Sequence, residues 1–222
     1  MPHGPASPFV IAVDGAAASG KGTIAGKLAT HYGLPHLDTG LLYRAVGAAM
    51  AEAGADLDDA DTAGRLARAL DLGRLGDSAL TTAAAGEAAS RVAALPEVRA
   101  ALLALQKDFA SQPGGAVLDG RDIGTVIAPA APAKLYVSAA PEVRAHRRWL
   151  QTSARGEART EAETLADLLK RDARDAGRAD APMRRADDAV LLDTSLMSIS
   201  TAFDEALRHV EQARRRWEAL TG

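Results

Sequence analysis

The sequence contains neither cysteine nor asparagine. Without cysteine, disulfides and thiolate zinc sites are excluded, and nothing requires an oxidising compartment. Without asparagine, the Asn-Lys-x-Asp motif by which GTPase-type switches recognise guanine is missing, so that class of binding module is excluded. No apolar run approaches the roughly 20 residues of a membrane span, and residues 1–8 lack the basic and apolar regions of a signal peptide. We therefore expect a cytoplasmic protein that does not contact a membrane.

A surplus of basic charge is also missing. The chain has 26 Lys and Arg against 29 Asp and Glu, a net charge of −3, which argues against general binding of nucleic acid or of a membrane surface. With 222 residues, 47% hydrophobic and only 4% aromatic, the chain suits one α/β domain with helices packed through small residues. We expect a single domain over 1–222 and a monomer. The scattered histidines lack metal-ligand spacing and are expected to be surface or core residues: His3, His31, His36, His146 and His209.

The chain is organised around residues 10–23. An apolar, β-branched run at 9–13 predicts a buried parallel strand, and apolar residues at helical spacing predict a helix from Thr23 to Gly33. Between them, Gly15 to Lys21 has the GxxxxGK spacing of a phosphate-binding P-loop, in which backbone N–H groups and a helix N-terminus face an anion. The predicted ATP-binding residues are Gly15, Ala16, Ala17, Ala18, Ser19, Gly20, Lys21, Gly22 and Thr23. The hydroxyl comes after Gly22 rather than directly after Lys21, and GKGT is typical of nucleoside monophosphate kinases.

Strands and helices alternate along the rest of the chain. Further strands are expected at 34–37, 116–118, 135–137 and 189–192, and further helices at 39–50, 96–109, 141–149, 161–176 and 198–220. This order predicts a three-layer α/β P-loop fold with a parallel five-stranded sheet and ligands at the carboxyl ends of the strands. The polar, alanine-rich region 55–95 is expected to be an insertion into this core, on the side that binds the acceptor of the phosphoryl group.

Charged residues follow two of the predicted strands. Asp119 ends the strand at 116–118, where P-loop enzymes direct an acid toward Mg²⁺, so Asp119 and Thr23 are the predicted metal ligands, with a structural loop aspartate as the alternative. We expect Arg121 to bind phosphate and Asp122 to bind the acceptor. Thr39 and Arg44 bracket the first turn of a helix and suggest a second phosphate site, unless Thr39 only caps that helix.

Arginines flank a polar segment late in the chain. One set is Arg144, Arg147 and Arg148, and the other is Arg171, Arg174 and Arg178. Segment 152–160 between them is expected to be a short arginine-rich lid, with a surface of ion pairs, Arg171 with Asp175 included, as the alternative. No side chain stands out as a general base, and an anionic acceptor needs none. Catalysis is therefore assigned to positioning, Mg²⁺ and the cations Lys21, Arg121 and Arg174.

Together the stretches VDGAAASGKGT, LDTGLLYR, ASRVAALPEVR, LDGRDIGTVI and KRDARDAGR resemble the bacterial cytidylate kinase family in content, order and spacing over residues 9–207. The resemblance implies that the P-loop holds ATP and that the acceptor is CMP or dCMP. By motif match, the residues that contact the acceptor are Thr39, Arg44, Ser90, Arg99, Arg121, Asp122, Arg171, Asp175 and Arg178. Two positions depart from the family pattern: Ala16 stands where proline is usual, and Thr81 stands where an arginine is expected.

Two alternatives remain open. Another small P-loop kinase, acting on adenylate, shikimate or a sugar acid, shares the same loop, although the long interval between Asp38 and Asp119 leaves room for the acceptor-side insertion and favours cytidylate. A P-loop protein that binds ATP without chemistry is the second.

Overall fold

The computed structural model describes residues 8–221. Residues 1–7, which include His3 and most of the segment tested for a signal peptide, lie outside the described residues. The strands are β1 (Val10–Gly15), β2 (His36–Asp38), β3 (Ala116–Gly120), β4 (Ala133–Ser138) and β5 (Val190–Asp193). The α-helices are α1 (Lys21–Tyr32), α2 (Thr39–Glu52), α3 (Ala60–Arg68), α4 (Ala83–Val92), α5 (Pro96–Ala110), α6 (Pro141–Ser153), α7 (Glu161–Ala176) and α8 (Ile199–Thr221). Short turns of tighter or wider helix are η1 (Leu72–Gly76), η2 (Ser78–Thr81) and η3 (Ile123–Ile127).

The predicted elements are present, and local chemistry explains where several begin. Helix α6 begins with Pro141, whose fixed φ and missing N–H suit the first turn of a helix. Helix α7 begins at a capping box, in which Thr160 accepts from the N–H of Glu163 and Glu163 accepts from the N–H of Thr160. Helix α2 is capped by Asp38, which accepts from the N–H of Gly40, so the alternative that Thr39 caps this helix is wrong.

The chain divides into two compact units, each built from separate stretches of sequence. The first unit comprises residues 1–37, 107–139 and 184–222, as far as the structure describes them, and the second comprises residues 38–106 and 140–183. Both the predicted insertion, 55–95, and the predicted lid, 152–160, fall in the second unit. No helix within residues 8–221 is long and apolar enough to cross a membrane.

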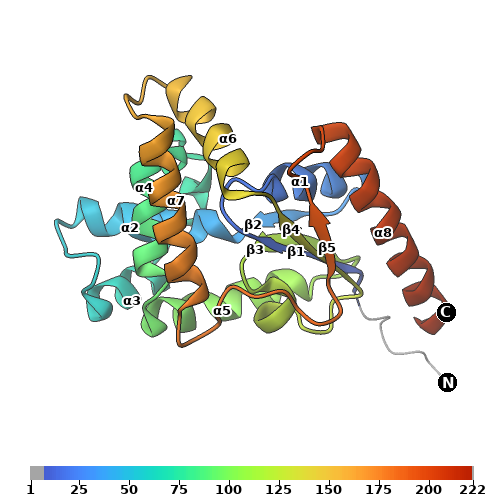
Figure 1. Ribbon diagram of the computed structural model, residues 1–222. Helices are drawn as coiled ribbons and strands as arrows, with labels where there is room; N and C mark the ends of the chain where they lie inside the picture. The colour runs from blue at the N-terminus through green and yellow to red at the C-terminus, as the bar shows by residue number, and fades with distance from the viewer. Residues whose placement is uncertain (1–7, 222) are drawn as a thin grey trace. The chain divides into compact units, whose positions relative to one another are not determined.

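The first unit holds the sheet. Over the described residues the sheet has five strands in the order β2-β3-β1-β4-β5, and β1 pairs in parallel with both β3 and β4. Helices α1 and α8 pack together on one face of this sheet (Figure 1). Their buried residues Leu28 and Val210 meet the strand residues Ile11 and Leu135 in one apolar core. The predicted parallel five-stranded fold is therefore confirmed, with the central strand β1 leading into the P-loop.

The second unit is helical. The region 55–95 contains α3, η1, η2 and α4, and α2 packs against both α3 and α4. Helices α6 and α7 form an antiparallel pair that an ion pair joins, with Nη2 of the buried Arg144 2.7 Å from Asp172 Oδ2. Because α6 continues to Ser153, the segment between the two helices is 154–160, two residues shorter than the expected lid. The expected end of this helix at residue 149 is therefore wrong.

Candidate active site

The P-loop follows β1 without a break. Gly15 has a φ of +148°, and a Cβ atom at this position would lie 2.0 Å from the carbonyl oxygen of Val137 on β4. Any other residue would collide with the backbone there, so glycine is required for the chain to turn away from the sheet. Ala18 adopts a positive φ of 60°, which is costly for a residue with a Cβ atom and shows how tightly the loop is bent.

A buried threonine supports the loop from behind. Ser19 is fully buried, and its carbonyl oxygen accepts a hydrogen bond of 2.9 Å from the hydroxyl of Thr194, which follows β5. The N–H of Thr194 in turn donates to the carbonyl of Ser138 at the end of β4, at 2.8 Å. Because the C=O and N–H of one peptide unit point in opposite directions, this contact turns the N–H of Gly20 away from Thr194. Thr194 thus supports the P-loop, and sequence reasoning missed it, although the residue before it, Asp193, directly follows a predicted strand.

Asp119 lies on β3, next to the P-loop strand. Its Oδ1 atom is 3.8 Å from Lys21 Nζ, and its Oδ2 atom is 2.8 Å from His36 Nε2. A Cβ atom at Gly22 would be 3.8 Å from Asp119 Oδ1, so the carboxylate faces the first turn of α1. The structure thus brings together the predicted catalytic lysine and one predicted metal ligand at the start of this helix.

The donor set suits Mg²⁺ better than a softer metal. The Asp119 carboxylate and the exposed Thr23 hydroxyl are hard oxygen donors, the type that Mg²⁺ prefers. Within residues 8–221, no group of three or more His, Cys, Asp or Glu side chains could hold a metal ion by itself. A site of this kind relies on nucleotide phosphates and water for its remaining ligands, as Mg²⁺ sites in kinases do.

Arg121 and Asp122 also lie in the first unit, directly after β3. Asp122 is buried, and its carbonyl accepts from the N–H groups of Val126 and Ile127, at 2.9 and 3.2 Å, in the turn η3. The buried side chain of Asp14, the residue before the P-loop, accepts from the N–H groups that follow Asp122. Burial raises the pKa of Asp14 to about 6, against the opposing effect of these hydrogen bonds. Sequence reasoning did not single out Asp14.

Four predicted acceptor residues converge in the second unit, between α4 and α7. Ser90 Oγ donates to Asp175 Oδ1 at 3.1 Å, and Arg171 Nε lies 3.8 Å from Asp175 Oδ2. One turn before Ser90 is Gly86, where a Cβ atom would be 3.2 Å from Arg171 Nη1 and 3.5 Å from Arg44 Nη2. The missing side chain at Gly86 therefore gives two guanidinium groups room to approach one another. Like charges held this close suit a site for an anion.

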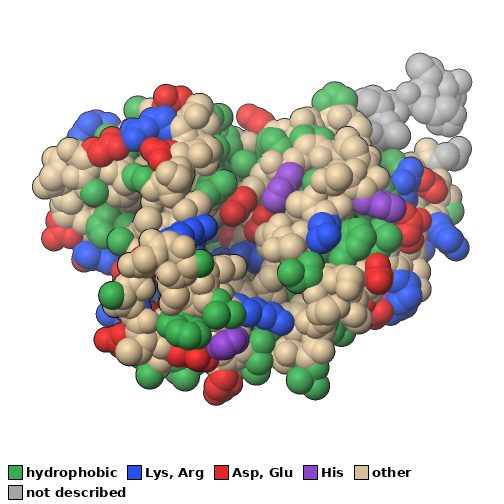
Figure 2. Space-filling model, turned by 90° about the horizontal axis from the view of Figure 1, so that it is seen from above, with side chains coloured by type: hydrophobic (Ala, Val, Ile, Leu, Met, Phe, Trp, Pro, Cys, Tyr) green, Lys and Arg blue, Asp and Glu red, His purple; other side chains and the backbone are tan. Residues whose placement is uncertain are grey.

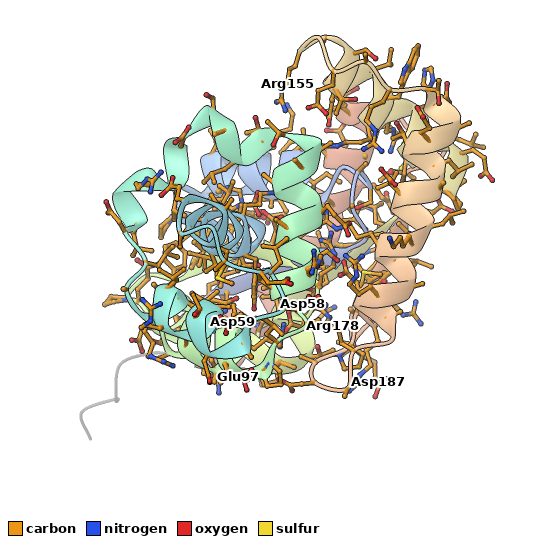
Figure 3. All side chains as sticks on the ribbon, turned by 90° about the vertical axis from the view of Figure 1, so that its left-hand side faces the viewer. Asp58, Asp59, Glu97, Arg155, Arg178 and Asp187 are labelled. Carbon is orange, nitrogen blue, oxygen red and sulfur yellow. The ribbon has the colours of Figure 1, made fainter. Side chains whose placement is uncertain are left out.

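The other predicted residues of the second unit are Arg178, Arg99, Arg174 and Thr39. Arg178, labelled in Figure 3, comes two residues after α7 and donates from Nε to the carbonyl of Asp175 at 3.2 Å. Arg99 is buried, with Nη1 3.4 Å from the hydroxyl of Tyr43. Arg174 forms an ion pair of 2.7 Å with Glu87 and lowers the pKa of that carboxyl. Thr39 is buried in the first turn of α2.

Two arginines in or next to the predicted lid donate to backbone carbonyls at the C-terminal end of η2. Arg155, labelled in Figure 3, donates to the carbonyl of Thr81 at 2.7 Å, and Arg148 donates to the carbonyl of Thr82 at 3.2 Å. Arg44 reaches the same stretch, donating to the carbonyl of Leu80 at 2.7 Å. A cavity of about 520 Å³ lies in this unit, lined among others by Arg148, Arg171, Arg159, Lys170, Glu87 and Glu157. Arg144, which belongs to the first predicted set of arginines, instead forms the ion pair that joins α6 to α7.

The surface agrees with the small net charge. On the face drawn in Figure 2, acidic, basic and hydrophobic side chains are interspersed. Four basic side chains, Arg148, Arg159, Lys170 and Arg171, are gathered around the cavity of the second unit.

A glycine-rich loop that leads from the central parallel strand into a helix, with its lysine beside an acid on the neighbouring strand, defines a P-loop nucleotide-binding protein. Comparison with known proteins makes this more specific. The sequence profile described as Cytidylate kinase matches residues 11–212. A cytidylate kinase from Caulobacter vibrioides (strain NA1000 / CB15N) is 64% identical over 208 residues, which cover 94% of this chain and 98% of the relative. One from Xanthobacter autotrophicus (strain ATCC BAA-1158 / Py2) is 61% identical over 206 residues, covering 93% of this chain and 99% of the relative.

The chain therefore belongs to the cytidylate kinase family, whose members are nucleoside monophosphate kinases. Among solved structures, a crystal structure of an uncharacterized protein from Eubacterium ventriosum ATCC 27560 has a TM-score of 0.52 at 16% identity, covering 92% of this chain and 98% of that chain. At this identity the similarity supports the fold alone.

Proposed function

We propose that this chain transfers the γ-phosphoryl group of ATP to CMP or dCMP, giving CDP or dCDP and ADP. The observation that carries the proposal is the P-loop with Lys21 beside Asp119, in a chain that is 64% identical to a cytidylate kinase over almost its whole length. The kinase family implies the use of ATP and of a nucleotide acceptor.

The donor site is assigned to residues 15–23. The N–H groups of the loop and the N-terminus of α1 bind the phosphates of ATP, and Lys21 stabilises the charge that develops on the transferred group. Asp119 and Thr23 would hold Mg²⁺, which would neutralise part of the charge on the phosphates of ATP.

The residues assigned to the acceptor nucleotide by motif match fall in two groups. Arg121 and Asp122 come from the first unit. From the second come Thr39, Arg44, Ser90, Arg99, Arg171, Asp175 and Arg178. Their chemistry suits a nucleoside monophosphate, because guanidinium groups match phosphate oxygens and the Ser90 and Asp175 pair offers a hydroxyl and a carboxylate to a sugar. Arg174, which forms an ion pair with Glu87 in this structure, is assigned to the transferred phosphoryl group.

No general base is assigned. The attacking oxygen belongs to a phosphate that is already anionic, so catalysis rests on alignment and on cations near the moving charge. We assign 55–95 to the acceptor-side insertion and 152–160 to the lid, within one kinase domain. The protein is expected to act as a monomer in the cytoplasm, where ATP and CMP are found.

A coupled ADP-release assay across CMP, dCMP, UMP, AMP and shikimate tests the proposal. We expect kcat/KM for CMP and dCMP to exceed the values for the other acceptors by at least about tenfold, because the wrong base leaves buried polar groups unpaired. A preference for AMP or shikimate would assign the chain to another small P-loop kinase. Nucleotide binding without ADP release from any acceptor would support a protein that binds ATP without chemistry.

A further inference from the structure

Asp14 is a buried carboxylate at the last but one position of the central strand, directly before the P-loop. Its side chain is only 4% exposed, and each of its oxygens accepts one backbone N–H. Oδ1 accepts from Ile123 and Oδ2 from Gly124, both at 2.8 Å. Two consecutive N–H groups therefore converge on one carboxylate, a charge-assisted contact between segments that are 109 and 110 residues apart in sequence.

The charged form of this carboxylate lowers the stability of the fold. The preceding strand residues Ala12 and Val13 are fully buried and apolar, and an apolar residue at position 14 would continue that core. Burial raises the pKa of Asp14 to about 6, so holding the charged form near pH 7 costs folding free energy. Asp14 thus makes a contact that an apolar residue cannot make, although it lowers the free energy of unfolding. This combination is common at functional positions.

The turn that Asp14 holds is the one that carries two predicted acceptor residues. Ile123 and Gly124 follow Arg121 and Asp122 directly in the chain. The same turn is closed on its other side, where the Asp122 carbonyl accepts from Val126 and Ile127. A Cβ atom at Gly124 would lie 3.4 Å from Asp14 Oδ2 and 3.2 Å from Lys134 Cδ, so the backbone here lies close against both side chains.

We propose that Asp14 is a positioning residue for the acceptor nucleotide, which fixes Arg121 and Asp122 to the strand that carries the P-loop. Strand β1 then positions both segments. The P-loop continues directly from its C-terminal end, and the turn after Asp122 is held by the Asp14 carboxylate. Small misplacements of aligned groups lower rates strongly, so one rigid strand serving both segments is an economical way to keep them aligned. The inference rests on the proposed function, since it takes the acceptor roles of Arg121 and Asp122 from there.

Asp14→Asn tests the proposal with little change of shape. The amide keeps one acceptor oxygen but presents an NH₂ group to the second backbone N–H, so one hydrogen bond is lost while the buried charge is removed. We expect KM for CMP to rise at least about tenfold, the Kd for ATP to stay within about twofold, and the melting temperature not to fall. A purely structural role predicts the opposite pattern, with a lower melting temperature and both substrates affected equally, and that result overturns the proposal.

A double-mutant cycle shows whether Asp14 acts through Arg121. If it does, the variant carrying both Asp14→Asn and Arg121→Met is little worse with CMP than Arg121→Met alone. Fully additive losses contradict the proposal. Val210→Ala, in the α8 part of the same core, is the matched control for general destabilisation and should lower the melting temperature without changing KM for CMP.

Hydrogen exchange of the wild-type protein does not depend on any variant folding. Without nucleotide, the amides of Ile123 and Gly124 should exchange as slowly as those of β1, and exchange at the rate of an open loop overturns the proposal. This measurement also separates the two hypotheses. If the wild type phosphorylates a different acceptor, the proposed function fails while slow exchange at these two amides still supports the contact, and KM is then measured for that acceptor.

Discussion

Thr194→Val tests the support behind the P-loop. Valine keeps the shape of threonine and removes only the hydroxyl, which donates to the Ser19 carbonyl at 2.9 Å. Both residues are buried, so water does not replace the lost donor, and an unsatisfied buried carbonyl costs about 1–3 kcal/mol. For a chain of this size, each kcal/mol lowers the melting temperature by about 2–4 °C. We expect a fall of roughly 2–12 °C, measured by thermal denaturation.

The same change should weaken ATP selectively. Without the hydroxyl, no hydrogen bond from residue 194 fixes the orientation of the peptide group between Ser19 and Gly20. The direction of the Gly20 N–H, which belongs to this peptide group, is then less well defined. A loss of about 1.4 kcal/mol corresponds to a tenfold increase in Kd, so an increase of about tenfold for ATP is expected in an equilibrium titration, with the Kd for CMP unchanged. Thr194→Ser retains the hydroxyl and is the control. An unchanged Kd for ATP in Thr194→Val, or an equal loss for CMP, refutes this reasoning.

The remaining predictions concern charge, base choice, the lid and pH. Lys21→Ala should lower kcat by on the order of 10²-fold with the fold intact by circular dichroism, and a loss of only a few-fold contradicts its role. Arg99 can only donate hydrogen bonds and suits the N3 and O2 acceptors of cytosine, so Arg99→Met should lower kcat/KM for CMP more than for UMP; equal losses make it a structural residue. Hydrogen exchange in 152–160 should slow when both nucleotides bind, and unchanged exchange excludes a lid that closes. The pKa of Asp14 is raised to about 6, so its protonated form stabilises the fold fully below about pH 4, and this contribution is lost as the pH rises through 6. Relative to Asp14→Asn, the wild type should therefore lose up to about 3 kcal/mol of unfolding free energy across this range in urea titrations, and parallel curves contradict the shift.

The parts of the site that local sequence encodes could be predicted from the sequence. The P-loop needs a strand, a glycine at a forbidden φ, a lysine and a helix start within about a dozen residues, so residues 10–23 carry the whole signal. Asp119 could also be predicted, because it ends an apolar run and parallel strands meet at one edge of the sheet. Asp14 and Thr194 could not, because their partners are 109 and 175 residues away and nothing in the adjacent sequence marks those contacts.

The helices within the predicted insertion could not be predicted for a second reason. Residues 55–95 are rich in alanine and glycine, so the apolar periodicity that marks a helix is weak there. Capping residues could have located two of its helices, because Asp59 accepts from the N–H of Thr62 and Thr82 accepts from the N–H of Ala85. The arginines show a third reason. Sequence spacing alone could not tell which arginines have a structural role. Arg144 pairs with Asp172 between α6 and α7, whereas Arg148 lines the cavity.

Phosphorus-31 NMR of the wild type with ATP, Mg²⁺ and CMP follows the transferred phosphoryl group itself and shows whether this chain phosphorylates CMP. We expect the β-phosphate resonance of CDP to grow at the rate at which the γ-phosphate resonance of ATP disappears, with no build-up of inorganic phosphate. If inorganic phosphate accumulates while CMP remains unchanged, or if ATP is not consumed at all, the chain does not transfer a phosphoryl group to CMP and the proposed function is wrong.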